Sequence, residues 1–250
     1  MKFPILVFLL SFAALWLSVK WGSSLRKRVK FLDEEQGRAD FSVIQAATLT
    51  LLGIIIGFSF SMAVSRYDQR KSCEAQEGNT IGTEYLRVEL LPTPDAAAAR
   101  EQLKKYVEQR IAWYKARDSD RLDQINHETA QVQERLWSAV RNGVQGQPAG
   151  VVILAVSGVN AVLDSQGYTE AAWLNRIPAA AWIMMETVAF FGGLLLGIGA
   201  HRRSPFLLLA LPFVVSVAFF LIADLDSPRG GLIRVHPDNL MSLSESLKQR

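Results

Sequence analysis

Long apolar runs alternate along the chain with segments that hold nearly all of its charge. Four runs are almost free of charged residues: Pro4–Val19, Phe41–Val64, Ile177–Ala200 and Phe206–Ala223. The hydrocarbon core of a bilayer is about 30 Å thick, so a helix needs about 20 apolar residues to cross it. The pattern therefore predicts an all-α integral membrane protein with four transmembrane helices.

The first run also has features of a secretory signal peptide, because Lys2 precedes the apolar residues. Against cleavage, Lys20 and Trp21 follow the run directly, and there is no clear A-x-A-like site. We favour an uncleaved first transmembrane helix, with a cleaved signal as the alternative.

The long region between the second and third runs, Ser65–Arg176, has a helical pattern. A helix is expected to start at Thr93–Pro94, with the threonine hydroxyl as cap and proline in the first turn. Its apolar face repeats at helical spacing: Leu103, Tyr106, Val107, Ile111 and Tyr114.

Two more helices follow in this region. Ser119 is the expected cap of the next helix, and Asn142–Gly143 its end. Val151–Leu163 is apolar but short for a membrane span, so we expect a buried helix. The expected domains are 1–64 (helices one and two), 65–176 (helical extramembrane domain), 177–224 (helices three and four) and 225–250 (tail).

The loops between the spans suggest an orientation. The first is basic, with Lys20, Arg26, Lys27, Arg28, Lys30 and Arg38, and the third contains His201, Arg202 and Arg203. Short basic loops stay in the cytoplasm. We therefore expect a multi-pass protein of the bacterial inner membrane, with both termini and the central domain on the periplasmic side.

Composition and motifs argue against nucleic-acid binding, catalysis and metal binding. Half of the residues are hydrophobic and the net charge is only +3, which gives no sign of nucleic-acid binding. Cys73 is the sole cysteine, so no disulfide forms within the chain. No common catalytic motif is present. His127, His201 and His236 lack metal-ligand spacing, and we expect no enzyme, no metal and no cofactor.

Glu186 interrupts the third apolar run. A carboxylate inside a span is costly and often marks a transport pathway. It is therefore the leading pathway candidate, expected otherwise to be neutral or to have a basic or hydroxyl partner. If the span starts near Thr187, Glu186 is interfacial instead.

Small residues follow one face of the second helix: Ala46, Thr50, Gly53, Gly57, Ser61 and Ser65. Small side chains let membrane helices approach closely. The face therefore serves either packing within one subunit, or a subunit interface or pore lining. Gln45, Thr48 and Ser59 add polar groups for hydrogen bonds between helices or for a wet wall. Gly193 and Gly197 on the third helix are expected to pack against the second helix.

Charges of both signs gather where the second and fourth helices end: Arg66, Asp68, Arg70, Asp224, Asp226 and Arg229. Their proximity predicts an ion-pair network at the membrane rim. A structural role is favoured because paired charges near a membrane usually satisfy each other. A selectivity or gating ring is the alternative.

Two motifs carry a family resemblance. The first runs from Arg66–Tyr67–Asp68 through an E-A-N-x-I-G-T-like turn, with Glu77, Asn79, Ile81, Gly82 and Thr83, to Tyr85–Leu86–Arg87 and Leu91–Pro92. The second is Asp224–Val235, DLDSPRGGLIRV. Both resemble the bestrophin-like family of bacterial membrane proteins.

The resemblance implies kinship to bestrophin anion channels, and so a homo-oligomeric, channel-like protein whose partners are the bilayer, its own copies and small ions. A non-conducting sensor or scaffold that binds a partner through its extramembrane helices is the alternative. Bestrophins keep the bulky domain in the cytosol, whereas the basic loops of this chain indicate the opposite orientation.

Overall fold

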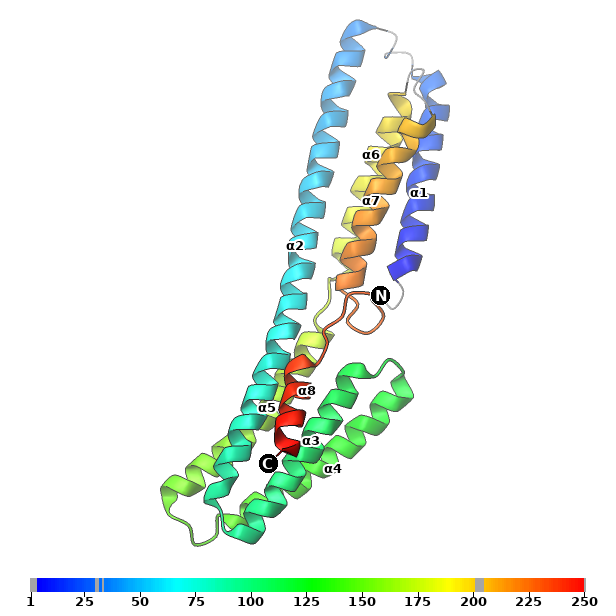
Figure 1. Ribbon diagram of the computed structural model, residues 1–250. Coiled ribbons are helices and arrows are strands. Elements are labelled where there is room, and N and C mark those ends of the chain that lie inside the picture. Colours follow the sequence, from blue (N-terminus) through cyan, green and yellow to red (C-terminus); the bar gives the residue numbers. More distant parts are fainter. Residues whose placement is uncertain (1–3, 30–31, 33, 201–204, 250) are drawn as a thin grey trace. The chain divides into compact units, whose positions relative to one another are not determined.

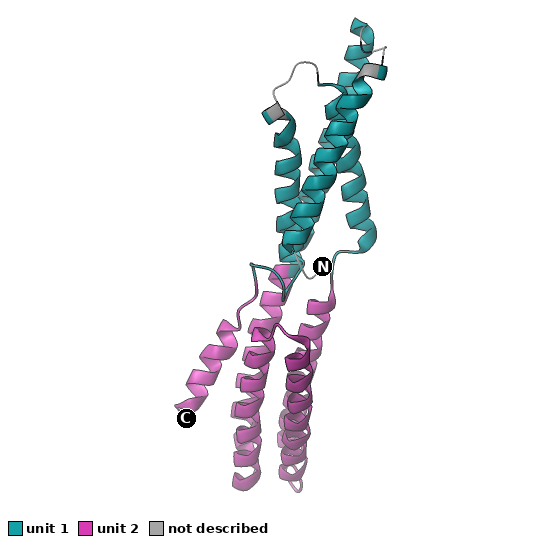
Figure 2. Cartoon of the chain, turned by 90° about the vertical axis from the view of Figure 1, so that its right-hand side faces the viewer, with its two compact units in different colours: residues 1–66, 176–233 teal, residues 67–175, 234–250 magenta. Residues whose placement is uncertain are grey.

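The computed structural model describes residues 4–29, 32, 34–200 and 205–249, and their regular structure is helical, without strands. The α-helices are α1 Pro4–Leu25, α2 Glu35–Arg87, α3 Thr93–Lys115, α4 Ser119–Gly143, α5 Ala149–Leu174, α6 Ala179–Ile198, α7 Pro205–Leu225 and α8 Asp238–Lys248. The chain divides into two compact units, coloured separately in Figure 2.

Unit 1 comprises Met1–Arg66 and Arg176–Ile233. In it α1, α6 and α7 lie side by side (Figure 1). Four described helical stretches are long and apolar enough to cross a membrane: Pro4–Leu25, Glu35–Leu90, Ala149–Ile198 and Leu208–Leu225. The prediction of an all-α chain with four candidate spans is confirmed. Within α2, the apolar section Phe41–Val64 is the part that we treat as spanning.

Glycines bring α6 and α1 into close contact. A Cβ atom at Gly193 would collide with Ser18 Oγ, and one at Gly197 would collide with Val19 O. Gly22 makes the matching approach from α1, toward Leu194 O. These glycines allow the two backbones to touch, as small residues do in membrane helices. The expected partner of Gly193 and Gly197 was the second helix; the helix that they contact is α1.

Unit 2 comprises Tyr67–Asn175 and Arg234–Arg250. Its core is formed by α3, α4, α5 and the C-terminal section of α2. On α3 the predicted apolar face is found, with Leu103, Tyr106, Val107 and Tyr114 buried. The Trp113 and Trp173 rings meet edge to face, with their centroids 4.7 Å apart, and join α3 to α5.

The second helix is much longer than its apolar section, and it does not turn at the family motif. α2 continues without a break from Glu35 to Arg87. Gly78 and Gly82 lie inside it because α8 packs against them: a Cβ there would lie 3.5 Å from Asn239 Cβ and 3.2 Å from Leu243 Cδ1, respectively. The turn expected at this motif is therefore wrong, and the glycines serve close packing.

Two expected helix caps also differ from the structure. Asp118, not Ser119, caps α4, and its carboxylate accepts a hydrogen bond from Arg121 N at 3.2 Å. α3 starts at Thr93 without a side-chain cap. The expected end of α4 at Gly143 is found. Val151–Leu163 lies in the N-terminal part of α5, which is buried on one side only.

The last 26 residues are not one tail. Residues 225–233 belong to unit 1 and 234–250 to unit 2, where α8 buries Leu240 and Leu247. Buried Glu74 of α2 accepts hydrogen bonds from Leu240 N at 3.0 Å and from Asn239 Nδ2 at 2.6 Å. A carboxylate at the N-terminus of α8 satisfies a free amide and opposes the positive end of the helix dipole.

Candidate functional site

The small-residue face of α2 is exposed along the whole spanning section. Its members Ala46, Thr50, Gly53, Gly57, Ser61 and Ser65 all lie on the surface of the chain. No atom of a neighbouring helix in the described chain lies within 4 Å of where a Cβ would be at Gly53 or Gly57. We call these six residues the small stripe. It faces something other than the described part of its own subunit.

The polar candidates Gln45, Thr48 and Ser59 lie on a different side of α2. Ser59 is buried, and the other two are half-buried. A Cβ at Gly199, which directly follows α6, would lie 3.2 Å from Gln45 Oε1, and one at Gly192 of α6 would lie 3.9 Å from Thr48 Cγ2. Gln45 and Thr48 therefore face α6, and the structure does not bring them together with the small stripe.

Glu186 has a hydroxyl partner inside the bundle. The buried Ser11 of α1 donates a hydrogen bond to Glu186 Oε1 on α6. Glu186 itself is half-buried. A hydroxyl partner was one of the predicted environments for this carboxyl, and it links α1 to α6 within the spanning region.

Asp226 joins three segments of unit 1. It follows α7, and its Oδ1 accepts hydrogen bonds from Ile177 N at 2.9 Å and from Arg66 Nη1 at 3.4 Å. The Asp226 side chain is 5% exposed, so its charge is held almost out of water. Removing one partner of a buried charge pair costs about 3–5 kcal/mol. The contact fastens α2, just past its spanning section, to the segment before α6 and to the residue that follows α7.

Asp224 closes the loop that follows α7. Its carboxylate accepts hydrogen bonds from Leu232 N at 2.6 Å and Ile233 N at 2.7 Å. A Cβ at Gly231 would lie 3.0 Å from Ser227 O, so glycine permits this tight return. Asp224 is only 1% exposed. The Asp224 carboxylate therefore binds backbone amides inside the subunit, whereas the carboxylates of an acidic ring at a pore mouth would face solvent.

The remaining rim residues have separate surroundings. Arg70, in unit 2, donates to Ala172 O at 3.3 Å and to Asn175 O at 3.4 Å, at the C-terminal end of α5. A cation there satisfies free carbonyls and favours the helix dipole. Asp68 is exposed and Arg229 is half-buried. Arg66 and Asp226 form an arginine–aspartate pair of the predicted kind.

A buried polar cluster in unit 2 was not predicted from the sequence. Arg110 of α3 and Glu77 of α2 are fully buried and paired. Glu77 Oε2 also accepts from Tyr114 OH at 3.2 Å and from Thr169 Oγ1 at 3.1 Å. The cluster joins α2, α3 and α5. The sequence does contain one sign of this cluster: Arg110 continues the apolar face of α3 one turn after Tyr106, which indicates a buried charge.

Glu84 is a second buried acid in unit 2, without such partners. Its carboxyl lies against Gly158 of α5, in the space that a Cβ there would fill. Neither carboxylate oxygen has a hydrogen-bond partner among the described residues. Burial raises the pKa of Glu84 to about 8, while the nearby Arg87 acts to lower it.

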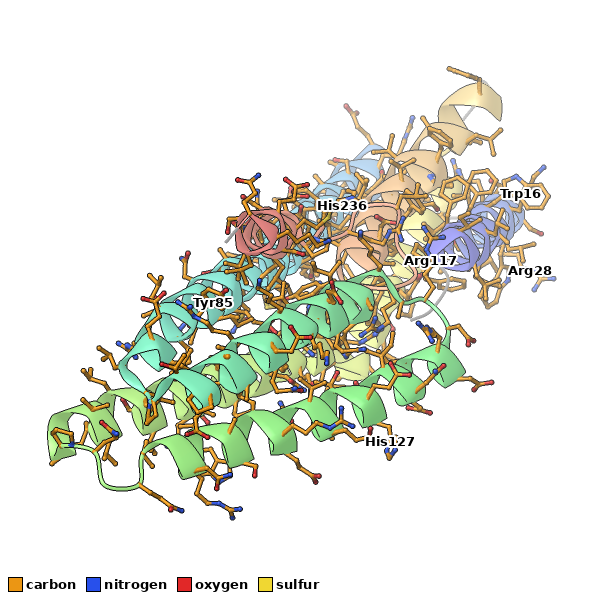
Figure 3. All side chains as sticks on the ribbon, turned by 60° about the horizontal axis from the view of Figure 1, so that its bottom comes forward. Trp16, Arg28, Tyr85, Arg117, His127 and His236 are labelled. Carbon is orange, nitrogen blue, oxygen red and sulfur yellow. The ribbon has the colours of Figure 1, made fainter. Side chains whose placement is uncertain are left out.

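The histidines and acidic residues of the described part of the chain do not gather into a metal-ligand cluster. No group of three or more His, Cys, Asp or Glu side chains there can hold an ion. His127 and His236 are exposed, and Figure 3 shows His127 on the outside of α4. His201 lies outside the described residues.

A comparison with known protein families identifies the family of this chain. The bestrophin-like domain matches residues 8–240. The chain belongs to the bestrophin-like family. This bestrophin-like protein matches no curated protein.

Solved structures show the same fold. A bestrophin homolog from Klebsiella pneumoniae has a TM-score of 0.66 at 15% identity, covering 98% of this chain and 96% of that chain. A structure described as a membrane protein variant has a TM-score of 0.67 at 14% identity, covering 97% and 96%. At these identities the likeness shows the fold alone, whereas the family match over residues 8–240 confirms the resemblance that the two motifs indicated.

Proposed function

We propose that this bestrophin-like protein assembles into a homo-oligomer in which copies of α2 surround a channel-like pore for small ions. The observation that carries the proposal is the small stripe. It runs the length of the spanning section, it is exposed, and the described part of its own subunit leaves it uncovered.

The composition of the stripe suits a pore better than a lipid-facing surface. A helix face that contacts only lipid gains nothing from glycine, serine and threonine, whereas a close subunit contact or a narrow lumen requires small side chains. Bulky apolar residues on the flanks of the stripe, such as Ile54, Phe58 and Met62, are also exposed. They provide surface for the neighbouring copies of the chain.

Orientation is part of the proposal. The basic loop after α1 supports a cytoplasmic position for that end of unit 1. Unit 2 then lies on the periplasmic side of the inner membrane, together with both termini. In this arrangement the protein acts by conduction and not by catalysis.

One observation favours a second candidate, a non-conducting scaffold or sensor. An open hollow of about 570 Å³ lies between α2 and α5 in unit 2. Uncharged polar side chains line much of it, including Gln69, Ser72, Gln76, Tyr168 and Asn175. Amide and hydroxyl groups of this kind suit a polar partner that binds without ion pairs.

Two measurements on the same preparation separate the candidates. The molecular mass of the protein–detergent complex, corrected for bound detergent, gives the number of copies. Ion flux from liposomes containing the protein then reports conduction. A pore requires more than one copy and flux above that of empty liposomes. An oligomer without flux favours the scaffold, and a monomer contradicts the proposed pore.

A further inference from the structure

An apolar hollow opens between α1 and α7 in unit 1. Its volume is about 490 Å³, within the range of about 300–1,000 Å³ that small-molecule sites occupy. Trp16, Val19, Lys20 and Ser23 line it from α1, and Leu208 and Leu209 line it from α7. Its wall is hydrocarbon and indole, apart from the lysine and the serine.

Lys20 supplies a charge that the described protein does not neutralise. No carboxylate among the described residues pairs with its ammonium group. The ammonium instead lies over the Trp16 ring, 5.5 Å from the centroid. Ser23 is the other polar side chain that lines the hollow; its neutral hydroxyl donates to Val19 O at 2.9 Å. A negative ligand would complement this end of the hollow.

The position of the hollow between two candidate membrane spans indicates where that ligand comes from. Both walls belong to candidate membrane spans, and the basic turn Arg26–Arg28 follows α1. Trp16, labelled in Figure 3, and Lys20 have the amphipathic side chains that mark the boundary between hydrocarbon and headgroups. A ligand here enters from the bilayer, with its apolar part toward the hydrocarbon and its charge toward water.

We propose that this hollow binds an anionic phospholipid, with an acyl chain against Trp16 and Leu209 and the headgroup phosphate on Lys20. The hydrocarbon wall supplies affinity for any lipid chain. Lys20 supplies the preference for a net negative headgroup, because a basic residue that meets the headgroup contributes about fivefold to binding of anionic lipid.

The test uses the full-length protein in mild detergent and native mass spectrometry. Phosphatidylglycerol and phosphatidylcholine with identical acyl chains serve as probes, added separately at equal concentrations. The wild type is expected to retain phosphatidylglycerol in preference to phosphatidylcholine. Lys20→Gln should reduce that preference about fivefold, and Lys20→Arg should keep it.

Two further variants test whether the lipid is bound in this hollow. One removes a charge outside it, and the other fills its wall. Arg28→Gln removes an exposed charge just beyond α1 that does not line the hollow, and it should preserve the preference. Leu209→Trp fills the apolar wall and should lower retention of both lipids. Equal retention of both lipids by the wild type overturns the proposal. So does a loss of preference in Arg28→Gln that matches the loss in Lys20→Gln.

Discussion

At the scale of single residues, Glu186 shows how one contact changes an interpretation. It is the only acidic residue of α6, which alone suggests a pathway. Ser11 gives it a partner inside the bundle, on a different helix from the small stripe. The partner favours a structural pairing, whereas a pathway role requires the carboxylate to meet ions.

Substitution distinguishes these roles for Glu186. Gln keeps the shape and the hydrogen bond to Ser11, so in the structural case Glu186→Gln should leave both ion flux and thermal stability nearly unchanged. We expect this result, with a change in stability below about 0.5 kcal/mol. Ser11→Ala should cost about 1 kcal/mol by removing the hydrogen bond. A changed flux, or a changed pH dependence of flux, in Glu186→Gln would restore the pathway role.

Glu84 predicts how the stability of unit 2 depends on pH. Its pKa is about 8 in the folded protein, against an ordinary value of 4.5. Between these values the folded state binds more protons than the unfolded state, so stability falls as pH rises. Each pKa unit is worth about 1.4 kcal/mol, so the shift from 4.5 to about 8 corresponds to a full loss on the order of 5 kcal/mol, complete above pH 8.

Unfolding of the purified protein at pH 5 and at pH 9 measures this loss. Glu84→Gln should make the two stabilities more alike, because the amide stays neutral at both. Glu108→Gln, at an exposed acid of α3, is the matched control and should retain the wild-type difference. If Glu84→Gln keeps the whole difference as well, the carboxyl is not the titrating group.

At the scale of helices, glycines in two GxxxG pairs have different surroundings and predict different defects. Gly197→Leu inserts a side chain where α1 and α6 touch, and it should destabilise the chain by about 1–3 kcal/mol or more. Gly57→Leu meets open space within the subunit. It should leave the stability of a dissociated chain intact and weaken assembly instead.

Both glycine variants should be measured for thermal stability and for the mass of the oligomer in detergent. Loss of oligomer in Gly57→Leu, with unchanged unfolding of the monomer, supports a contact between copies. Equal destabilisation of the dissociated chain by the two variants would mean that Gly57 packs inside the subunit after all.

The helices also show what the sequence could predict. Four spans follow from apolar length alone, and the face of α3 follows from its spacing. The extension of α2 past Val64 does not, because Gly78 and Gly82 in a polar segment suggest a turn until α8 is known to lie on them. α8 has only 11 residues, and its packing partners are far away in sequence.

The site residues also fall into those that the sequence could predict and those that it could not. The Arg66–Asp226 pair was predictable, since both residues lie just beyond the apolar section of a spanning helix. The Glu77–Arg110 pair was harder to find, because an arginine inside an apolar face has no partner until the fold brings α2 beside α3. The sequence also could not separate the small stripe from Gln45 and Thr48, since the position of α6 decides which face of α2 is covered.

At the scale of the whole molecule, Cys73 reports the orientation in the membrane. It is the only cysteine, and it lines the open hollow of unit 2. With unit 2 in the periplasm, a membrane-impermeant maleimide should label intact spheroplasts. Burial raises the pKa of the Cys73 thiol, so labelling should be done near pH 8 and compared with denatured protein. Labelling only after lysis would place unit 2 in the cytoplasm.

The central claim is that the small stripe lines a pore between copies of the chain. The most direct measurement is ion flux through liposomes containing Ser61→Cys in a Cys73→Ser background, before and after a positively charged thiol reagent. Met62→Cys, one residue further along and about 100° around the helix, is the matched control. We expect flux in both variants and block by the reagent only at position 61. Block at position 62 alone, or flux unaffected at both positions, would contradict it.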